Sequence, residues 1–453
     1  IEPVAKYLVD ERLAGPAAAA LLSIGGPEAT RALLSALDEA PRKARLVLIQ
    51  SLGEARSHEA VPKILPFADS EDAGIRQAAL YALANIGDPA AGPVLSRARV
   101  ASPLRERRAA PSLYLLYARR LLEVGRTSEG LEAARAVLES YRRPEESQHA
   151  SEALALVVST LGERALPDLL AAVDSPDGRF RGSALALAAS IPGTDATLAW
   201  VDKARTSPPG TQVAILAMLT ERGDAAALPF ARECLASQDE MVRRAAIPAA
   251  SRLGGVAVLP DLLPFLGSAC PEERAALKTA LLGYPGELVV PETVRLLDST
   301  PHPGRLVLAE VLGEKAGRDQ AERVFRLCED TEPATRAAGL AALARLAAED
   351  DLPRLVAMAE ATRKSRDRTA LQEAMAAVVR RNPDSTQQAL LGLLRDGTAD
   401  GKVVILGALP KLGGAEPLRA VVVEAEGPDP AVQSAAIKAL VQWPEEAAAD
   451  ELG

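Results

Sequence analysis

A pattern of about 31 residues recurs along the whole chain, and it limits the possible folds more than any other feature. Each copy has an anchor position, most often arginine, followed by alanine and leucine at helical spacing, as in 75–83 and 432–440. The anchors are Ala14, Arg45, Arg76, Arg107, Ala150, Arg181, Gln212, Arg243, Arg274, Arg305, Arg336, Arg368, Lys402 and Gln433. Most steps between neighbouring anchors are 31 residues. A fixed period of this length is typical of proteins built from stacked helical units.

A second helical segment precedes each anchor segment. It carries apolar residues at helical spacing and a proline near its start, as in 60–66, 165–170 and 258–263. Proline fits the first turn because the backbone N–H there needs no helical partner. Four aspartates stand four residues before an anchor, where a carboxylate can cap the second helix: Asp72, Asp177, Asp239 and Asp429. Each unit is therefore predicted as helix A, a turn, helix B and then glycine.

The repeat predicts an all-α fold, an α-solenoid (superhelix) of about fourteen antiparallel helix pairs that forms a single domain over residues 1–453. One pair cannot bury its own apolar stripe, so neighbouring pairs must stack into a continuous core. Apolar residues make up 48% of the chain but aromatic residues only 3%. Thin layers of alanine and leucine between slender helices account for this shortage of bulky side chains.

The spacing of aspartate, three residues, arginine and then alternating alanine and leucine resembles the HEAT repeats. The resemblance is closest to the short bacterial form and to HEAT-like repeats of the PBS-lyase type, and it covers essentially the whole chain. It implies that helix A lies on the convex side of the superhelix and helix B on the concave side. It also implies a structural ladder of arginines that bond to loop carboxylates and carbonyls between units: Arg45, Arg76, Arg107, Arg181, Arg243, Arg305, Arg336 and Arg368.

The period breaks once, between Arg107 and Ala150, where the step is 43 residues. The stretch 118–135 resembles one tetratricopeptide unit, so we predict an irregular, tetratricopeptide-like insertion around 111–146. Such an insertion would turn the superhelix at this point.

The same region carries a local excess of positive charge. Residues 97–143 hold eleven arginines and five glutamates, whereas the whole chain has a formal net charge of −9. Arginine beside aromatic residues can form a surface for an anion or an acidic partner. The candidates for such a patch are Arg105, Arg108, Arg119, Arg120, Arg126, Tyr141, Arg142 and Arg143. Tyr114 and Tyr117 lie in the same stretch but are expected in the core.

Residues for catalysis, metals or cofactors are scarce. The three histidines are scattered, the three cysteines show no CxxC spacing, and no nucleotide-binding or serine-hydrolase motif occurs. We therefore expect no catalytic site, no metal site and no cofactor, and we expect each cysteine to pack as a small apolar residue on a helix. The chain also shows no apolar run near 18 residues, which predicts no membrane span.

The architecture favours a non-catalytic scaffold that binds a protein partner or an adjoining domain through its concave helix-B surface. One alternative is the accessory region of a larger multidomain bacterial enzyme, because both ends look cut and 436–444 resembles the close of HEAT arrays in large bacterial multidomain proteins. A nucleic-acid-binding HEAT protein of the alkylpurine glycosylase type is the third reading, and the acidic charge balance argues against it. The sequence names neither the partner nor the oligomeric state, and it leaves the compartment open.

Overall fold

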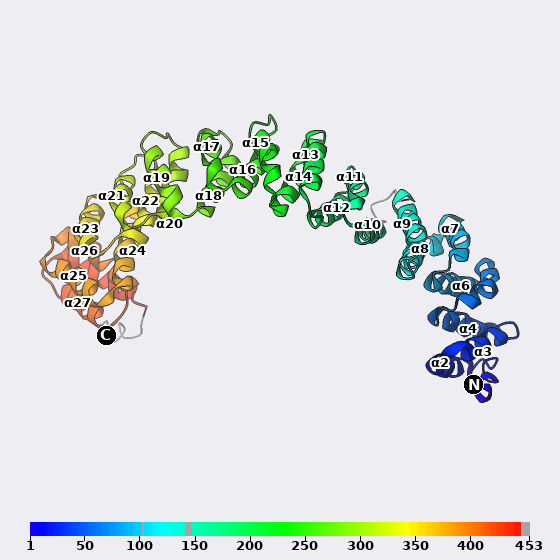
Figure 1. Ribbon diagram of the computed structural model, residues 1–453. Coiled ribbons are helices and arrows are strands. Elements are labelled where there is room, and N and C mark those ends of the chain that lie inside the picture. The colour runs from blue at the N-terminus through cyan, green and yellow to red at the C-terminus, as the bar shows by residue number, and fades with distance from the viewer. Residues whose placement is uncertain (102–103, 141–146, 445–453) are drawn as a thin grey trace. The chain divides into compact units, whose positions relative to one another are not determined.

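The computed structural model describes residues 1–101, 104–140 and 147–444, and the side chains of all of these except 100–109. The described residues form helices and turns, with no strand among them (Figure 1). The chain divides into two compact units, Ile1–Ala227 and Leu228–Gly453. Within each unit the odd-numbered helices lie along one side and the even-numbered helices along the other (Figure 1). The single domain over 1–453 stays a prediction.

The even-numbered helices are the predicted helix-B elements. In the first unit they are α2 (Ala14–Ile24), α4 (Arg42–Glu54), α6 (Ala73–Ile86), α8 (Leu104–Glu123), α10 (Ser147–Leu161), α12 (Gly178–Ala189) and α14 (Pro209–Arg222). In the second unit they are α16 (Glu240–Gly254), α18 (Pro271–Gly283), α20 (Gly304–Lys315), α22 (Pro333–Leu346), α24 (Ser365–Arg381), α26 (Ala399–Leu406) and α28 (Pro430–Val441). Every predicted anchor falls inside one of these helices, so the repeat register is confirmed.

The odd-numbered helices are the helix-A elements, and several are short or joined to 3-10 turns. In the first unit they are α1 (Glu2–Ala5), α3 (Gly26–Ala36), α5 (Val61–Ile64) with η2 (Leu65–Asp69), α7 (Gly92–Ala101), α9 (Thr127–Ser140), α11 (Leu166–Ala172) and α13 (Thr194–Arg205). In the second unit they are α15 (Leu228–Leu235), α17 (Leu259–Leu262) with η8 (Leu263–Gly267), α19 (Gly286–Leu297), α21 (Ala321–Leu327), α23 (Leu352–Ala361), α25 (Pro383–Asp396) and α27 (Ala415–Ala425). The α-solenoid of antiparallel helix pairs is thereby confirmed.

The four aspartates cap the helices as predicted. Asp72 accepts hydrogen bonds from the backbone N–H groups of Gly74 and Ile75, and Asp239 accepts from those of Met241 and Val242. Asp177 and Asp429 cap α12 and α28 in the same way. These bonds satisfy donors that the first turn of a helix leaves free, and they fix where each helix B begins.

Small residues let neighbouring helix-B elements approach closely. A Cβ atom added to Gly53 of α4 would lie 2.7 Å from the Cα atom of Ala82 in α6, and one added to Gly313 of α20 would lie 3.0 Å from the Cβ atom of Ala342 in α22. The core between the helices consists mainly of buried leucine, valine, isoleucine and alanine. The thin apolar layers that the composition predicts are therefore present.

The long step in the repeat is taken up by longer helices. α8 has 20 residues and α9 has 14, and a turn at Gly125, whose φ is +80°, joins them as an antiparallel pair. In the described residues α9 packs against both α8 and α10. The extra residues thus lengthen one helix pair, and the tetratricopeptide-like character of 111–146 stays a prediction. Tyr114 and Tyr117 are buried in α8, as expected.

One segment bears on the expectation that the chain has no membrane span. By length and composition alone, Glu240–Gly267 is long and apolar enough to cross a bilayer, and 33% of its most apolar stretch is buried. The segment comprises α16, α17 and two 3-10 turns, and α17 packs back against α16. A spanning helix needs about 20 residues in one continuous rod, and this segment bends before it reaches its end.

Candidate functional site

The anchor arginines bind the turn that precedes their own helix. Six of them donate from a guanidinium Nη atom to the backbone carbonyl six residues earlier. The pairs are Arg76 with Ser70, Arg181 with Ser175 (2.9 Å), Arg243 with Ser237 (2.9 Å), Arg274 with Ser268, Arg336 with Asp330 (2.8 Å) and Arg368 with Thr362 (2.9 Å). Each bond closes the turn between helix A and helix B and gives one backbone carbonyl of that turn a hydrogen-bond donor.

Three anchor arginines also reach a carboxylate near the next turn. Arg243 donates from Nε to Glu273 at 2.7 Å, and Arg336 donates to Asp367 at 2.7 Å. Arg305 donates to Asp330 at 3.2 Å. These charge-assisted bonds link successive repeats, and the pattern favours a structural role for the ladder.

Two ladder members differ from the rest. Arg45 stacks over the ring of Phe67, with 5.6 Å between the guanidinium carbon and the ring centroid. Arg107 lies in α8 by its backbone, and its side chain is outside the described residues.

The predicted basic patch is only partly described. The side chains of Arg105, Arg108, Tyr141, Arg142 and Arg143 lie outside the described residues. Of the other three candidates, Arg119 is exposed, and Arg126 pairs with Glu129 at 3.6 Å. The structure therefore describes the side chains of only three of the eight predicted members of this patch.

Arg120, the remaining candidate, is held by internal contacts. It donates from Nε and Nη2 to the side-chain oxygen of Asn85, at 3.0 and 2.9 Å, and from Nη1 to Glu123. Asn85 in turn donates to the carbonyl of Gly53 at 3.0 Å. The hydrogen bond from Arg120 is the main cause that lowers the pKa of Glu123. The chain of bonds connects α4, α6 and α8.

A second arginine set, which the sequence analysis missed, caps the carboxyl ends of helix-B elements. Arg222 at the end of α14 donates to the carbonyl of Ala188 (2.9 Å) in the last turn of α12, and to those of Ile191 and Gly193 (3.0 Å) just beyond it. Arg381 at the end of α24 donates to the carbonyls of Ala344 and Ala347 in the same way. The only sequence signal is a basic residue in the last turn of helix B, because the partners lie 29 to 37 residues away.

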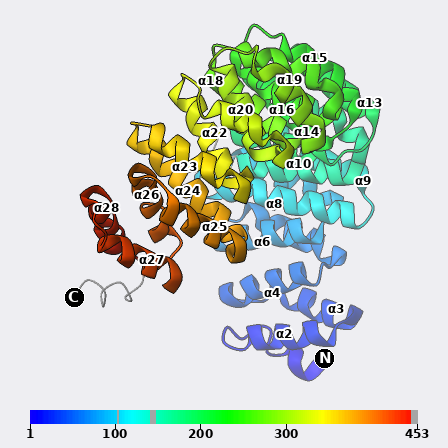
Figure 2. The same cartoon turned by 90° about the vertical axis from the view of Figure 1, so that its left-hand side faces the viewer.

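A hollow on a helix-B face crosses α18, α20 and α22. These three helices pack in that order (Figure 2). We call this hollow the helix-B groove, and it has a volume of about 870 Å³. Five alanines of α22 form its floor: Ala334, Ala337, Ala338, Ala341 and Ala342. Leu282 and Leu306 add apolar surface from the two neighbouring helices.

Charged side chains on the rim of the helix-B groove pair with one another. Lys278 lies 3.1 Å from Glu310, and Arg345 lies 3.1 Å from Glu314. The first pair joins α18 to α20, and the second joins α20 to α22. The resulting surface is apolar at its centre and polar at its edge, as protein interfaces are.

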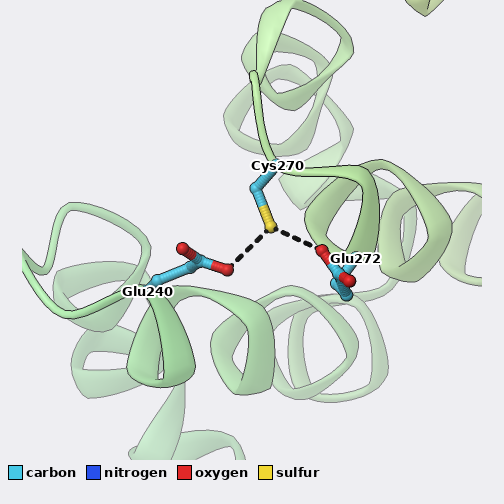
Figure 3. Close-up of side chains that lie close together, drawn as sticks. All are labelled: Glu240, Cys270 and Glu272. Atoms are coloured by element: carbon cyan, nitrogen blue, oxygen red, sulfur yellow. Dashed lines mark hydrogen bonds between the residues drawn. The ribbon is translucent and has the colours of Figure 1, made fainter.

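The cysteines follow the prediction in two cases out of three. Cys234 and Cys328 are buried, and burial raises the pKa of the Cys328 thiol to about 12. The prediction is wrong for Cys270, which is only half-buried and stands at the N-cap of α18. Its Sγ atom, with carboxylate oxygens of Glu240 and Glu272, forms a group of potential metal ligands within 4.8 Å (Figure 3). The hydrogen bond to Glu240 is the main cause that raises the pKa of the Cys270 thiol.

The histidines make polar contacts of their own. His58 Nδ1 lies 2.8 Å from an oxygen of Asp88, and His149 Nε2 lies 2.9 Å from the hydroxyl of Ser112. No group of metal-ligating side chains among the described residues includes a histidine.

The family of HEAT repeats matches residues 30–115 and 197–281. Within these two ranges the chain is similar to HEAT repeats, and the helix pairs in these ranges are among those described above. The curated proteins contain no match to the chain.

Solved structures resemble the chain at low identity. Kap121p is 12% identical with a TM-score of 0.46, over 97% of this chain and 53% of that one. Kap95p, in a structure with RanGDP, is 13% identical with a TM-score of 0.43, over 97% and 70%. Human deoxyhypusine hydroxylase is 22% identical with a TM-score of 0.24, over 64% and 95%. The chain spans about half the length of Kap121p.

Proposed function

We propose that the chain is a non-catalytic scaffold that binds a protein partner, or an adjoining domain of the same polypeptide, through its helix-B face. The helix-B groove is the observation that carries the proposal. Its floor consists of alanines, of which Ala334, Ala337 and Ala341 are exposed to solvent. A partner helix can come close to such a floor because no long side chain stands in its way.

The energetics of the groove fit a surface that is used for binding. Four of its rim charges, those of Lys278, Glu310, Glu314 and Arg345, are already paired within the chain, so a partner need not neutralise these four before it contacts the floor. Apolar burial would then supply the affinity, at about 25 cal/mol per Å² of apolar surface covered, less the cost of association. The paired charges at the edge would supply orientation rather than raw affinity.

The test is affinity capture from the cells that naturally express the chain, with matched variants. Ala337→Glu and Ala341→Glu place a charge on the groove floor, whereas Ala357→Glu makes the same change at an exposed alanine of the helix-A element α23. We expect the wild type and A357E to retain the same partner and the groove variants to lose it. Retention by all four proteins would contradict binding in the groove, and the absence of any retained partner would contradict the scaffold function.

A further inference from the structure

Three potential metal ligands meet at the starts of two neighbouring helix-B elements (Figure 3). Glu240 is the first residue of α16, Cys270 is the N-cap of α18, and Glu272 lies in the first turn of α18. The thiol sulfur lies 2.9 Å from Oε1 of Glu240 and 3.2 Å from Oε2 of Glu272. Both glutamates are exposed and the cysteine is half-buried, so the group is open to ions in solution.

Cys270 stands where the repeat elsewhere places a capping aspartate. In the turns of α6, α12 and α16, a serine hydroxyl accepts the backbone N–H of the aspartate at 3.2 Å, and the aspartate caps the helix. Cys270 keeps the first bond, from its N–H to Ser268 at 3.1 Å, but its side chain makes no cap bond. The thiol sulfur lies between the two carboxylates (Figure 3).

In this repeat a different carboxylate, that of Glu273, makes the contacts that hold neighbouring repeats together. Glu273 is 2% exposed and accepts hydrogen bonds from Arg243 at 2.7 Å and from Ser268. In the part of the chain that the structure describes, neither Glu240 nor Glu272 forms an ion pair within 4.0 Å, although Arg244 and Arg274 act on Glu272 at longer range. Two carboxylates held this close repel each other, and a bound cation would remove that repulsion.

We propose that Glu240, Cys270 and Glu272 form a binding site for a divalent cation of the zinc class. Zinc accepts both thiolate sulfur, at about 2.3 Å, and carboxylate oxygen, at about 2.0–2.2 Å. Magnesium and calcium take oxygen ligands, so the thiolate disfavours them. Three protein ligands leave a fourth tetrahedral position for water. On binding, the Cys270 thiol releases its proton to solvent as the sulfur–metal bond forms. The site goes beyond the scaffold function and does not depend on it.

Cobalt(II) titration of the reduced, full-length chain tests the site, because a thiolate ligand gives cobalt a near-ultraviolet charge-transfer band. Zinc competition against bound cobalt then gives the zinc affinity. Cys270→Ser removes the thiolate, and serine is a favoured N-cap, so the variant should fold. Glu240→Gln and Glu272→Gln remove one carboxylate each. Glu287→Gln, at an exposed glutamate in the first turn of α19, is the matched control.

We expect one cobalt per chain with a charge-transfer band in the wild type and in E287Q. C270S should lose the band, and E240Q and E272Q should each weaken binding by at least about tenfold, since even an outer partner of a metal ligand contributes that much. A wild type without the band would overturn the site. Cobalt that binds without the band, or with a band that C270S retains, would be an adventitious ion only and would overturn it equally.

Discussion

At the scale of single residues, one anchor arginine holds two turns together. Arg336 donates to the carbonyl of Asp330 in its own turn and to the carboxylate of Asp367 in the next repeat. Only 10% of the Arg336 side chain and 14% of the Asp367 side chain are exposed. Removal of one member of such a pair costs more than the pair contributes, because the other charge stays buried without a partner.

Arg336→Met should therefore lower the free energy of unfolding by about 3 kcal/mol, measured as the shift of the urea transition that involves the second unit. Arg363→Met, at an exposed arginine in the turn between α23 and α24, should change it by less than about 0.5 kcal/mol. Asp367→Leu in the R336M background should recover part of the loss. An R336M variant as stable as the wild type would remove the structural explanation of the ladder.

The cap of α6 gives a prediction about pH. The bond from Arg42, followed by the backbone N–H of Ile75, lowers the pKa of Asp72 from 3.8 to about 2. A lowered pKa in the folded state means that the carboxylate stabilises the fold above about pH 4 and loses this effect as the pH falls through 2. Carboxyl NMR should show Asp72 titrating near 2, and Arg42→Gln should raise its pKa toward 3.8. Titration near 3.8 in the wild type would show that the bond is absent in solution.

Local spacing explains which residues could be predicted. Asp72 and Asp239 cap the helix that begins at the next residue, and Arg336 bonds six residues back, so fixed offsets in the sequence identify them. Arg120 and Arg222 bond to residues 35 and 31 positions away, and those distances depend on how the repeats stack. The only sequence signal at Cys270 is a departure from the pattern, because cysteine stands where other repeats have the capping aspartate.

At the scale of the helices, close approach between helix-B elements limits residue size. Gly53→Ala should lower the free energy of unfolding by about 1–3 kcal/mol, because the new methyl group would overlap the backbone of Ala82. Gly182→Ala, in α12, has no atom within 4 Å of the new Cβ and should raise it by up to about 1 kcal/mol. Thermal unfolding of both variants checks the opposite signs. Equal effects would show that α4 and α6 lie farther apart.

The arginine caps give a second prediction about helices. Arg222→Met should free the carbonyls at the end of α12 and cost about 1–3 kcal/mol. Hydrogen exchange should then speed up at the end of α12 near Ala188 and not at its start, where Asp177 still caps the helix. Arg179→Met, at an exposed arginine of the same helix, is the control. Unchanged exchange near Ala188 in R222M would contradict the cap.

At the scale of the whole molecule, the periodic pattern predicts the fold but not the binding surface. The period of 31 places all fourteen helix-B elements, because each anchor lies in one of them. It does not distinguish Ala337, which is exposed on the groove floor, from Ala342, which is buried in the same helix. That difference depends on the rotation of α22 against its neighbours, and the repeat fixes this rotation only through packing.

Hydrogen–deuterium exchange of the full chain with and without its captured partner tests the central claim most directly. If the helix-B face binds the partner, protection should appear in α18, α20 and α22 around the helix-B groove, and the helix-A elements α19, α21 and α23 should exchange as in the free chain. Protection of the helix-A elements alone, with the groove helices unchanged, would contradict the account.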